Sequence, residues 1–519
     1  MTAAPDTAFR TEVVNPLLAG LGATVAPPCA LVVFGASGDL CRRKLLPALA
    51  RLAARHVMSG AFSVVGVART EWDDADFAHL AEDALAGGGA LGAPGDNGNL
   101  VAGFRYVAGD YAQDETFERL AAVLDDLDRT RGTEGNRLYY LAVPPTAFPV
   151  VVNGLGRHGL NRPPPAWPGA FVRLVVEKPF GRDRSTAEAL DREVHAAFDE
   201  RQVFRIDHYL GKDTVQNVLA LRFANSLFES TWNRRYIDML QVTVAETGGV
   251  ETRGAFYEET GALRDIVQNH VLQVFALVLM EPPAGADADA VRDEKVKALR
   301  AVAPPAPDDL ATQTVRAQYG PGLVDGLAVR GYRQEPGVPP DSTTETFVAV
   351  RLHVENWRWA GVPIYVRTGK RLPKRVSEVA IQYQRPPHVP FGPGHVHDHE
   401  ADVLVIRIHP DDGVAITFGA KAPGRGFEVR RASMEFLYES AFPGEALGPY
   451  ERLLLDALVG DPTLFLRSDE VAEAWRIVDP IEQAWAEGRP PLVTYPAGTW
   501  GPEEAEELVR RDGRRWHQP

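Results

Sequence analysis

The chain has 519 residues, 45% of them hydrophobic and 24% charged. A chain of this length can form about two to four domains with large cores. Its ordinary charged fraction argues against wholesale disorder. The formal net charge of −15 argues against nucleic acid or an anionic membrane as the main partner. An anionic small molecule would need a local basic pocket, so clustered Lys and Arg residues are more informative than the average charge.

The only two cysteines are Cys29 and Cys41, which excludes a disulfide framework and a cysteine-based metal cluster. Residues 1–28 show no basic segment followed by an apolar run, so no secretory signal is visible. The longest apolar stretch, residues 271–280, is too short to cross a bilayer and predicts a buried core helix. We therefore expect a cytoplasmic protein without a membrane partner.

In the first part of the chain, short apolar runs alternate with helical patterns. The runs lie at residues 30–34, 63–68, 105–107, 138–143 and 171–176. A capping box at residues 185–188 predicts the start of a helix that continues to about residue 200. Continuous apolar strands alternating with helices predict a doubly wound parallel α/β sheet of the Rossmann type. We place this dinucleotide-binding domain at residues 30–205, after an N-terminal extension of residues 1–29.

After about residue 205 the pattern changes. Helices are expected at residues 214–227 and 262–280, and a helical tail from residue 450 onward. Strands are expected at residues 238–245, 346–355, 378–384, 403–409 and 414–418. Several alternate apolar with polar residues, which is typical of an antiparallel sheet with one covered face. Residues 206–519 are therefore predicted to form a larger α+β domain on a mostly antiparallel sheet.

Two glycines, Gly35 and Gly38, lie at the turn between the first strand and its helix. Such a turn lets the backbone approach a pyrophosphate, which then lies at the N-terminus of the helix. The pattern is shorter than the full Gly-x-Gly-x-x-Gly fingerprint, so a plain tight turn is the alternative. The residues of this candidate cofactor site are Gly35, Ala36, Ser37, Gly38, Asp39 and Leu40.

Arg69 ends the second strand. Enzymes that prefer NAD usually carry an acidic residue here for the ribose 2′-hydroxyl, whereas an Arg suits a 2′-phosphate. Glu71 is close enough to favour the free hydroxyl instead. We predict NADP as the cofactor, with NAD possible.

Polar residues also gather at the end of a strand and in a short segment after it. Lys178 follows the C-terminal end of a strand, and ligands bind at such ends in open α/β sheets. Residues 205–213 offer donors that suit a phosphate, together with one carboxylate: Asp207, His208, Tyr209 and Lys212. If this segment turns helical at once, His208 and Lys212 share one face.

A third polar group combines Glu246 with residues 264–270. On an α-helix Asp265 and Asn269 would lie one turn apart, with His270 at the edge of the same polar arc. Polar residues at the start of so apolar a helix need partners in the interior. A lone histidine here would more often be a core residue whose hydrogen bonds are satisfied. The polar neighbours of His270 favour a functional role instead.

A basic patch at residues 366–375 includes Lys370 and Arg375. It lacks the earlier glycine of a phosphate-binding P-loop, and a solvated turn is the alternative to a phosphate contact. His395, His397 and His399 lie in a Pro/Gly-rich loop, but their spacing gives no closed metal site. We predict no functional metal.

Together these motifs resemble glucose-6-phosphate dehydrogenases in order and approximate spacing. The matching segments are residues 35–40, 177–181, 205–212, 264–270 and 369–370, and the resemblance extends over about residues 30–480. Asp213 departs from the longer acidic or amide residue, or Lys, that is usual there. Val376 replaces a basic residue that some eukaryotic relatives use for a second, structural nucleotide, so we do not infer that site.

The resemblance implies that His270 is the general base and that Asp207 orients its ring. Hydride would pass from C1 of glucose 6-phosphate to NADP and give the lactone, the first step of the oxidative pentose phosphate pathway. The implied substrate-binding residues are Lys178, His208, Tyr209, Lys212, Glu246, Asp265, Lys370 and Arg375. The implied cofactor-binding residues are those of the glycine turn with Lys44, Arg69, Tyr140 and Lys178. The resemblance also implies a homodimer or homotetramer, paired through the antiparallel sheet.

Two other functions remain open. A different sugar or hydroxy-acid dehydrogenase could use the same nucleotide domain, since a fold does not fix its substrate. A nucleotide-sensing or scaffolding protein without catalysis is the second alternative. The presence of both His270 and Asp207 argues against it.

Overall fold

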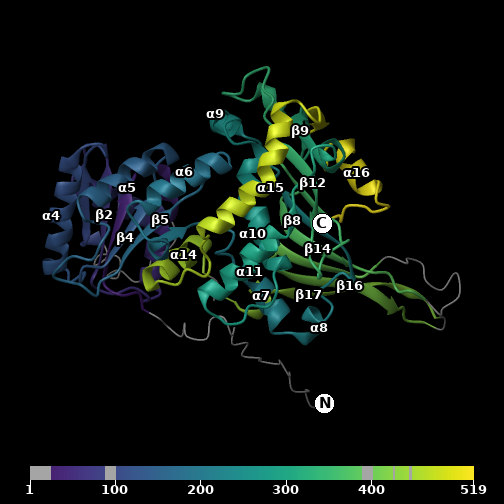
Figure 1. Cartoon of the computed structure of the whole chain (residues 1–519), viewed down its shortest axis with the longest axis horizontal. Coiled ribbons are helices and arrows are strands. Elements are labelled where there is room, and N and C mark those ends of the chain that lie inside the picture. Colours follow the sequence, from purple (N-terminus) through teal and green to yellow (C-terminus); the bar gives the residue numbers. More distant parts are fainter. Residues whose placement is uncertain (1–24, 88–100, 389–400, 425–426, 444–446) are drawn as a thin grey trace, which may run out of the picture.

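The computed structural model describes residues 25–87, 101–388, 401–424, 427–443 and 447–519 (Figure 1). Its first sheet has six parallel strands in the order β3-β2-β1-β4-β5-β6. Their bounds are β1 (Cys29–Phe34), β2 (Phe62–Ala68), β3 (Phe104–Ala108), β4 (Arg137–Leu141), β5 (Val172–Val176) and β6 (Val203–Arg205). This strand order is that of dinucleotide-binding folds, and it confirms the predicted Rossmann-type sheet.

Helices cover this sheet because each buries one apolar stripe. In α4 (Asp114–Thr130) the buried residues Phe117, Leu120, Leu124 and Leu127 follow a helical spacing of three and four. The other helices of this layer are α1 (Leu46–Ala54), α2 (Asp74–Gly87), α5 (Phe148–Arg157) and α6 (Arg184–His195).

The predicted capping box of α6 was wrong by two residues. Asp183 is the N-cap, because its carboxylate accepts the backbone N–H of Thr186 at 2.7 Å. The Thr186 hydroxyl in turn accepts the backbone N–H of Asp183 at 3.1 Å. The helix also ends at His195, earlier than expected.

The second sheet has ten strands in the order β17-β16-β15-β14-β7-β13-β12-β9-β18, with β8 paired to β12 off this path. Two pairs, β7/β13 and β9/β18, are parallel and the others antiparallel, which confirms a mostly antiparallel sheet. The bounds are β7 (Ile237–Ala245), β8 (Val302–Ala303), β9 (Thr314–Gly320), β12 (Phe347–Val354), β13 (Ile364–Gly369), β14 (Val376–Tyr383), β15 (Val403–His409), β16 (Gly413–Lys421), β17 (Val429–Leu437) and β18 (Val493–Pro496).

One face of this large sheet packs against helices. Along β12, Val348, Val350 and Leu352 join the main core with those helices, whereas Ala349 joins a smaller cluster with Trp516 on the other face. The helices of the main core are α7 (Asp213–Phe223), η6 (Leu263–Val271), α10 (Leu272–Leu279), α11 (Ala288–Arg300), α14 (Pro449–Val459) and α15 (Ser468–Ala486). In Figure 1 α10, α11 and α14 lie between the two sheets, and α16 (Glu503–Arg510) lies on the far side of the large one.

Two helix predictions for this domain needed correction. The helix expected at residues 214–227 is divided into α7 and α8 (Ser226–Glu229), because Asn225 takes an extended conformation. The helix expected at residues 262–280 exists, and all of α10 is buried as predicted, but residues 263–271 of that range form the π-helix η6. Other short elements include α9 (Gly254–Glu258), α12 (Leu310–Gln313), α13 (Tyr438–Ala441), β10 (Gly322–Val324) and β11 (Leu327–Val329).

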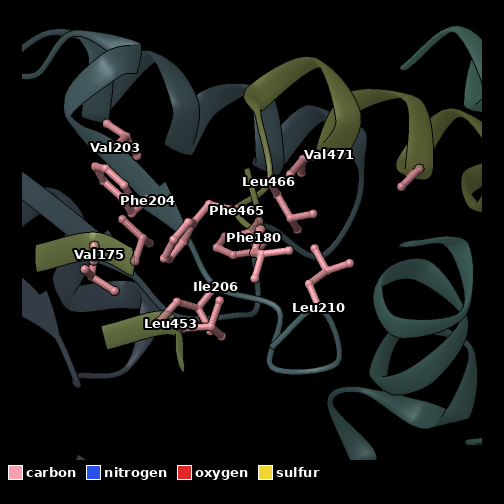
Figure 2. Packing of buried hydrophobic residues seen from close by; sticks show 14 of the residues in the cluster. Val175, Phe180, Val203, Phe204, Ile206, Leu210, Leu453, Phe465, Leu466 and Val471 are labelled. Carbon is pink, nitrogen blue, oxygen red and sulfur yellow. The ribbon is translucent and has the colours of Figure 1, made fainter. Parts of the chain in front are cut away.

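The first sheet packs against α14, α15 and the segment between them through an apolar core near the ends of β5 and β6 (Figure 2). The rings of Phe204 and Phe465 lie edge to face with centroids 4.8 Å apart. The backbone N–H of Leu466 donates to the carbonyl of Arg205 at 3.0 Å. This packing fixes the strand ends from which Lys178 and Asp207 emerge. Among the described residues, no helix has the length and apolar character needed to cross a bilayer.

Candidate active site

The glycine turn packs against the end of β4. Gly35 has a φ of +86°, and a Cβ added to it would lie 2.3 Å from the carbonyl oxygen of Ala142, so only glycine fits. The backbone N–H of Gly38 donates to the carbonyl of Gly35 at 2.9 Å. Because β1 and β4 are the strands at which the strand order reverses, the turn lies at the crevice where this fold binds its ligands.

The other predicted cofactor residues divide into an exposed group and a buried one. Ser37, Asp39, Lys44 and Arg69 are exposed. The Thr70 hydroxyl, next to Arg69, donates to the Ser37 hydroxyl at 2.9 Å, so the end of β2 contacts the turn. Within the turn Ala36 is buried, while Leu40 is partly buried against the core.

Tyr140 is fully buried, and its hydroxyl donates to Oε1 of Glu177 at 2.6 Å. Burial raises the pKa of Glu177, and its hydrogen bond with Tyr140 opposes that effect. Tyr140 therefore holds the residue that precedes Lys178.

His270 and Asp207 meet although 63 residues separate them along the chain. Nδ1 of His270 lies 2.5 Å from Oδ1 of Asp207, and both side chains are buried. Oδ1 of Asp207 also accepts the backbone N–H of Tyr209 at 2.9 Å, which fixes the carboxylate. A neutral ring with its hydrogen on Nδ1 satisfies this contact and leaves Nε2 as an acceptor.

The π-helical turn changes which side chains of η6 share a face. A π-helix forms hydrogen bonds between residues i and i+5, which changes the register of its side chains from that of an α-helix. In η6, Asp265 and His270 lie together at Lys178, in place of the predicted pair Asp265 and Asn269. Lys178 contacts both: its Nζ atom lies 2.8 Å from Nε2 of His270 and 3.4 Å from Oδ1 of Asp265. Asn269 instead donates to the carbonyl of Arg264 at 3.0 Å and accepts the backbone N–H of His270 at 2.6 Å.

Burial and neighbouring charges shift the pKa values of this group. Burial and the nearby Lys178 cation lower the pKa of His270, and Asp207 opposes them. Burial would raise the pKa of Asp207, but His270 holds it well below its usual range. Burial lowers the pKa of His208 to about 3. Both imidazoles are therefore neutral at neutral pH, and a neutral imidazole is what a general base requires.

Two of the predicted phosphate residues, Tyr209 and Lys212, follow one another outward from the His270 ring. The Tyr209 ring stacks on the His270 ring with centroids 4.3 Å apart. The Lys212 ammonium lies 4.7 Å from the centre of the Tyr209 ring. Burial lowers the pKa of Lys212, and the charge of the exposed Arg375 adds to this effect. Residues 208–212 form a turn and not a helix, so the predicted shared helix face of His208 and Lys212 was wrong.

Glu246 and Lys370 meet at the ends of the parallel strands β7 and β13. Their side chains form an ion pair, and the backbone N–H of Glu246 donates to the carbonyl of Gly369 at 3.0 Å. Burial would raise the pKa of the Asp265 carboxyl, but Lys178 and Lys370 hold it below its usual value. Lys370, which pairs with Glu246, therefore also acts electrostatically on Asp265, which lies with Lys178 and His270.

The sequence analysis missed two side chains at this site. The Tyr450 ring, at the start of α14, lies parallel to the His208 ring with centroids 6.4 Å apart. Asp412, in the turn before β16, is the carboxylate that opposes the effect of burial on Lys212. A lone Tyr or Asp at a turn carries no local signal, so only the tertiary fold identifies them.

Asp207, His208 and His270 could each offer a ligand atom to a metal ion, and these atoms lie within 4.8 Å of one another. Nε2 of His270 is, however, in contact with the Lys178 ammonium, which would repel a cation. The arrangement therefore fits a hydrogen-bonded base better than a metal site. The loop with His395, His397 and His399 lies outside the described residues.

Comparison with known proteins gives the family of the chain. Residues 32–217 match the family model described as the NAD binding domain of glucose-6-phosphate dehydrogenase. Residues 219–517 match the model of its C-terminal domain. The chain is also 48% identical, over 498 residues, to glucose-6-phosphate 1-dehydrogenase of Aggregatibacter actinomycetemcomitans, with 95% of this chain and 98% of that one covered.

Solved structures agree. A glucose-6-phosphate dehydrogenase in complex with its substrate glucose-6-phosphate superposes with a TM-score of 0.86 at 32% identity, covering 95% of this chain and 99% of that one. The glucose-6-phosphate 1-dehydrogenase of Mycobacterium avium gives a TM-score of 0.79 at 37% identity, with the same coverage. The chain therefore belongs to the glucose-6-phosphate dehydrogenase family of oxidoreductases.

Proposed function

We propose that the chain oxidises glucose 6-phosphate at C1 to 6-phosphogluconolactone and transfers the hydride to NADP. The observation that carries the proposal is the buried contact of His270 with Asp207, 2.5 Å long, beside a cluster of basic side chains. Such a pair supplies a base for a hydroxyl proton, and the basic cluster suits a phosphate. The relatives named above support the substrate.

In the proposed reaction, Nε2 of His270 accepts the proton of the C1 hydroxyl. The C1–H bond breaks, its electron pair leaves as a hydride, and C1 becomes the carbonyl carbon of the lactone. When bound, the dinucleotide accepts this hydride on its nicotinamide ring. Asp207 stabilises the positive charge that the His270 ring gains.

We assign the sugar phosphate to His208, Tyr209, Lys212, Lys370 and Arg375. Lys212 supports this assignment best, because its ammonium is partly buried over the Tyr209 ring. Glu246 and Asp265 would accept hydrogen bonds from sugar hydroxyls. Lys178, already in contact with His270 and Asp265, would lie between the sugar and the nicotinamide.

The cofactor assignment rests on the glycine turn and on Arg69. We propose that residues 35–40 bind the pyrophosphate, with Lys44 and Tyr140 nearby, and that Arg69 binds the 2′-phosphate of NADP. NAD remains possible because Glu71, two residues on, is exposed as well.

We further propose that the reaction begins the oxidative pentose phosphate pathway and that the chain is a homodimer or homotetramer paired through the large sheet. Met434 and Phe436 on β17 at the edge of that sheet are exposed, which supports pairing there; light scattering would measure it. We place the domain boundary near residue 205, where the last strand of the first sheet ends. The cytoplasmic location stays a prediction.

The decisive experiment measures reduced-cofactor absorbance with glucose 6-phosphate and each dinucleotide, beside free glucose. His270→Asn keeps the size of the side chain but cannot accept the proton, so kcat should fall by about 10²–10⁴-fold with substrate binding nearly unchanged. A wild-type chain that turns over free glucose as well as the phosphate would instead indicate a different sugar dehydrogenase. No turnover at all would favour a nucleotide-sensing or scaffolding role.

A further inference from the structure

Helix α15 contacts both walls of the candidate active site, although it contributes no residue to it. Trp475, Asp479 and Glu482 are spaced four and three residues apart and therefore lie on one face of the helix. Each contacts a different segment of the chain. Two of these segments carry residues of the proposed reaction.

The first wall is the loop that follows β5. The indole N–H of Trp475 donates to the carbonyl of Phe180 at 2.9 Å, and this contact is buried. One turn further along α15, the Asp479 carboxylate accepts the backbone N–H of Arg184 at 3.1 Å, at the start of α6. Lys178 precedes Phe180 by two residues, so α15 fixes the loop on which Lys178 lies.

The second wall is η6. The Arg264 guanidinium donates to Oε2 of Glu482 at 2.6 Å. The carbonyl of Arg264 accepts the amide of Asn269, whose oxygen accepts the backbone N–H of His270. Arg264 thus connects Glu482, which its side chain contacts, to Asn269 and the backbone of the proposed base, which its carbonyl holds.

We propose that α15 is a positioning helix and that Glu482, acting through Arg264, holds η6 so that His270 faces Lys178. The inference rests on the proposed function, because it concerns how the proposed base is placed. Glu482 is a positioning residue and touches neither the sugar nor the dinucleotide.

Neighbouring charges act on the ion pair between Glu482 and Arg264. Burial raises the pKa of Glu482 to about 7, and the Arg264 cation opposes this effect, whereas Glu345 and Asp479 add to it. Glu345 is itself partly buried and accepts the backbone N–H of Leu263, at the start of η6, at 3.0 Å. Without Arg264, the charges of Glu345 and Asp479 would raise the pKa of Glu482 with no cation to oppose them, so the Arg264–Glu482 pair both balances this charge and ties η6 to α15.

The test is Glu482→Gln, which keeps the size of the side chain but removes the charge that Glu482 carries above its pKa of about 7. Glu473→Gln is the matched control. Glu473 lies on the same helix, is 18% exposed against 15% for Glu482, and pairs with Arg300 and Arg476 away from the site. Misplacing a catalytic group by about 1 Å can cost about 100-fold in rate, so we expect kcat to fall by about tenfold in Glu482→Gln. In Glu473→Gln it should change less than about twofold.

A double mutant separates positioning from loss of folded protein. If Glu482 acts by placing His270, then Glu482→Gln should lower kcat less than about twofold once His270 is already Asn. Equal losses of kcat in both backgrounds, or equal kcat values for Glu482→Gln and its control, would overturn the inference. If Glu482→Gln does not fold, Arg264→Lys breaks the same paired geometry and takes the same assays. A wild-type chain inactive on glucose 6-phosphate would refute the proposed function itself, a result distinct from each of these.

Discussion

The Nζ atom of Lys178 lies 2.8 Å from Nε2 of His270. On the other side of the same ring, Nδ1 contacts Asp207. A cation and an anion therefore act on the pKa of His270 in opposite directions. The two neighbours can be removed one at a time, which gives a pair of predictions with opposite signs.

Lys178→Met removes the cation that helps burial to lower the pKa of His270. That pKa should rise. A general base works in its neutral form, so activity is lost as the pH falls through its pKa. The acid limb of kcat/KM should therefore move to higher pH. A pH profile between about 5 and 8 measures this shift. An acid limb that does not move would mean that Lys178 has no effect on the pKa of His270.

Asp207→Asn removes the carboxylate that stabilises the charged ring. The pKa of His270 should fall further, so the acid limb should move to lower pH. At the same time kcat should fall, because the ring loses the partner that orients it and balances its charge. The same pH profile measures both effects. A limb that moves to higher pH would contradict the contact between these residues.

Much of the framework that carries these residues could be predicted from the sequence. Continuous apolar strands predicted the parallel sheet, because strands buried on both faces leave that pattern. In the second sheet β15 was predicted with its observed bounds, since its apolar residues are followed by the alternation of apolar and polar residues at its end. Strand β17 was missed, because at the edge of the sheet most of its side chains are exposed and its sequence lacks an apolar signal.

The geometry of the site could be predicted only in part. Asp265 and His270 were candidates from their types, but α-helical spacing paired Asp265 with Asn269. A π-helical turn depends on the packing of η6 against other elements, and no local pattern of residues revealed it. Tyr450 lies more than 200 residues after His208 along the chain, so its place beside that ring follows from the tertiary fold alone.

Lys212→Ala tests the phosphate assignment. A charge-assisted contact is worth about 1.5–3 kcal/mol, so KM for glucose 6-phosphate should rise about tenfold or more. Turnover of free glucose, where measurable, should hardly change, since glucose lacks the phosphate. Lys374→Ala, which removes an exposed lysine of the same basic segment, is the control for lost positive charge. Equal losses on both sugars would assign Lys212 to the fold and not to the phosphate.

Arg69→Ala tests the cofactor assignment. The guanidinium is exposed at the end of β2, next to Thr70, whose hydroxyl contacts Ser37 of the glycine turn. A guanidinium can bind a 2′-phosphate through paired hydrogen bonds. NAD lacks this phosphate. We therefore expect kcat/KM for NADP to fall by about ten- to a hundredfold, the cost of a lost charged contact, while the value for NAD stays within about threefold. Arg192→Ala, at an exposed position on α6, controls for the charge alone. Equal losses of kcat/KM for both dinucleotides would mean that Arg69 shapes the pocket without binding the phosphate. Another residue would then have to explain a preference for NADP.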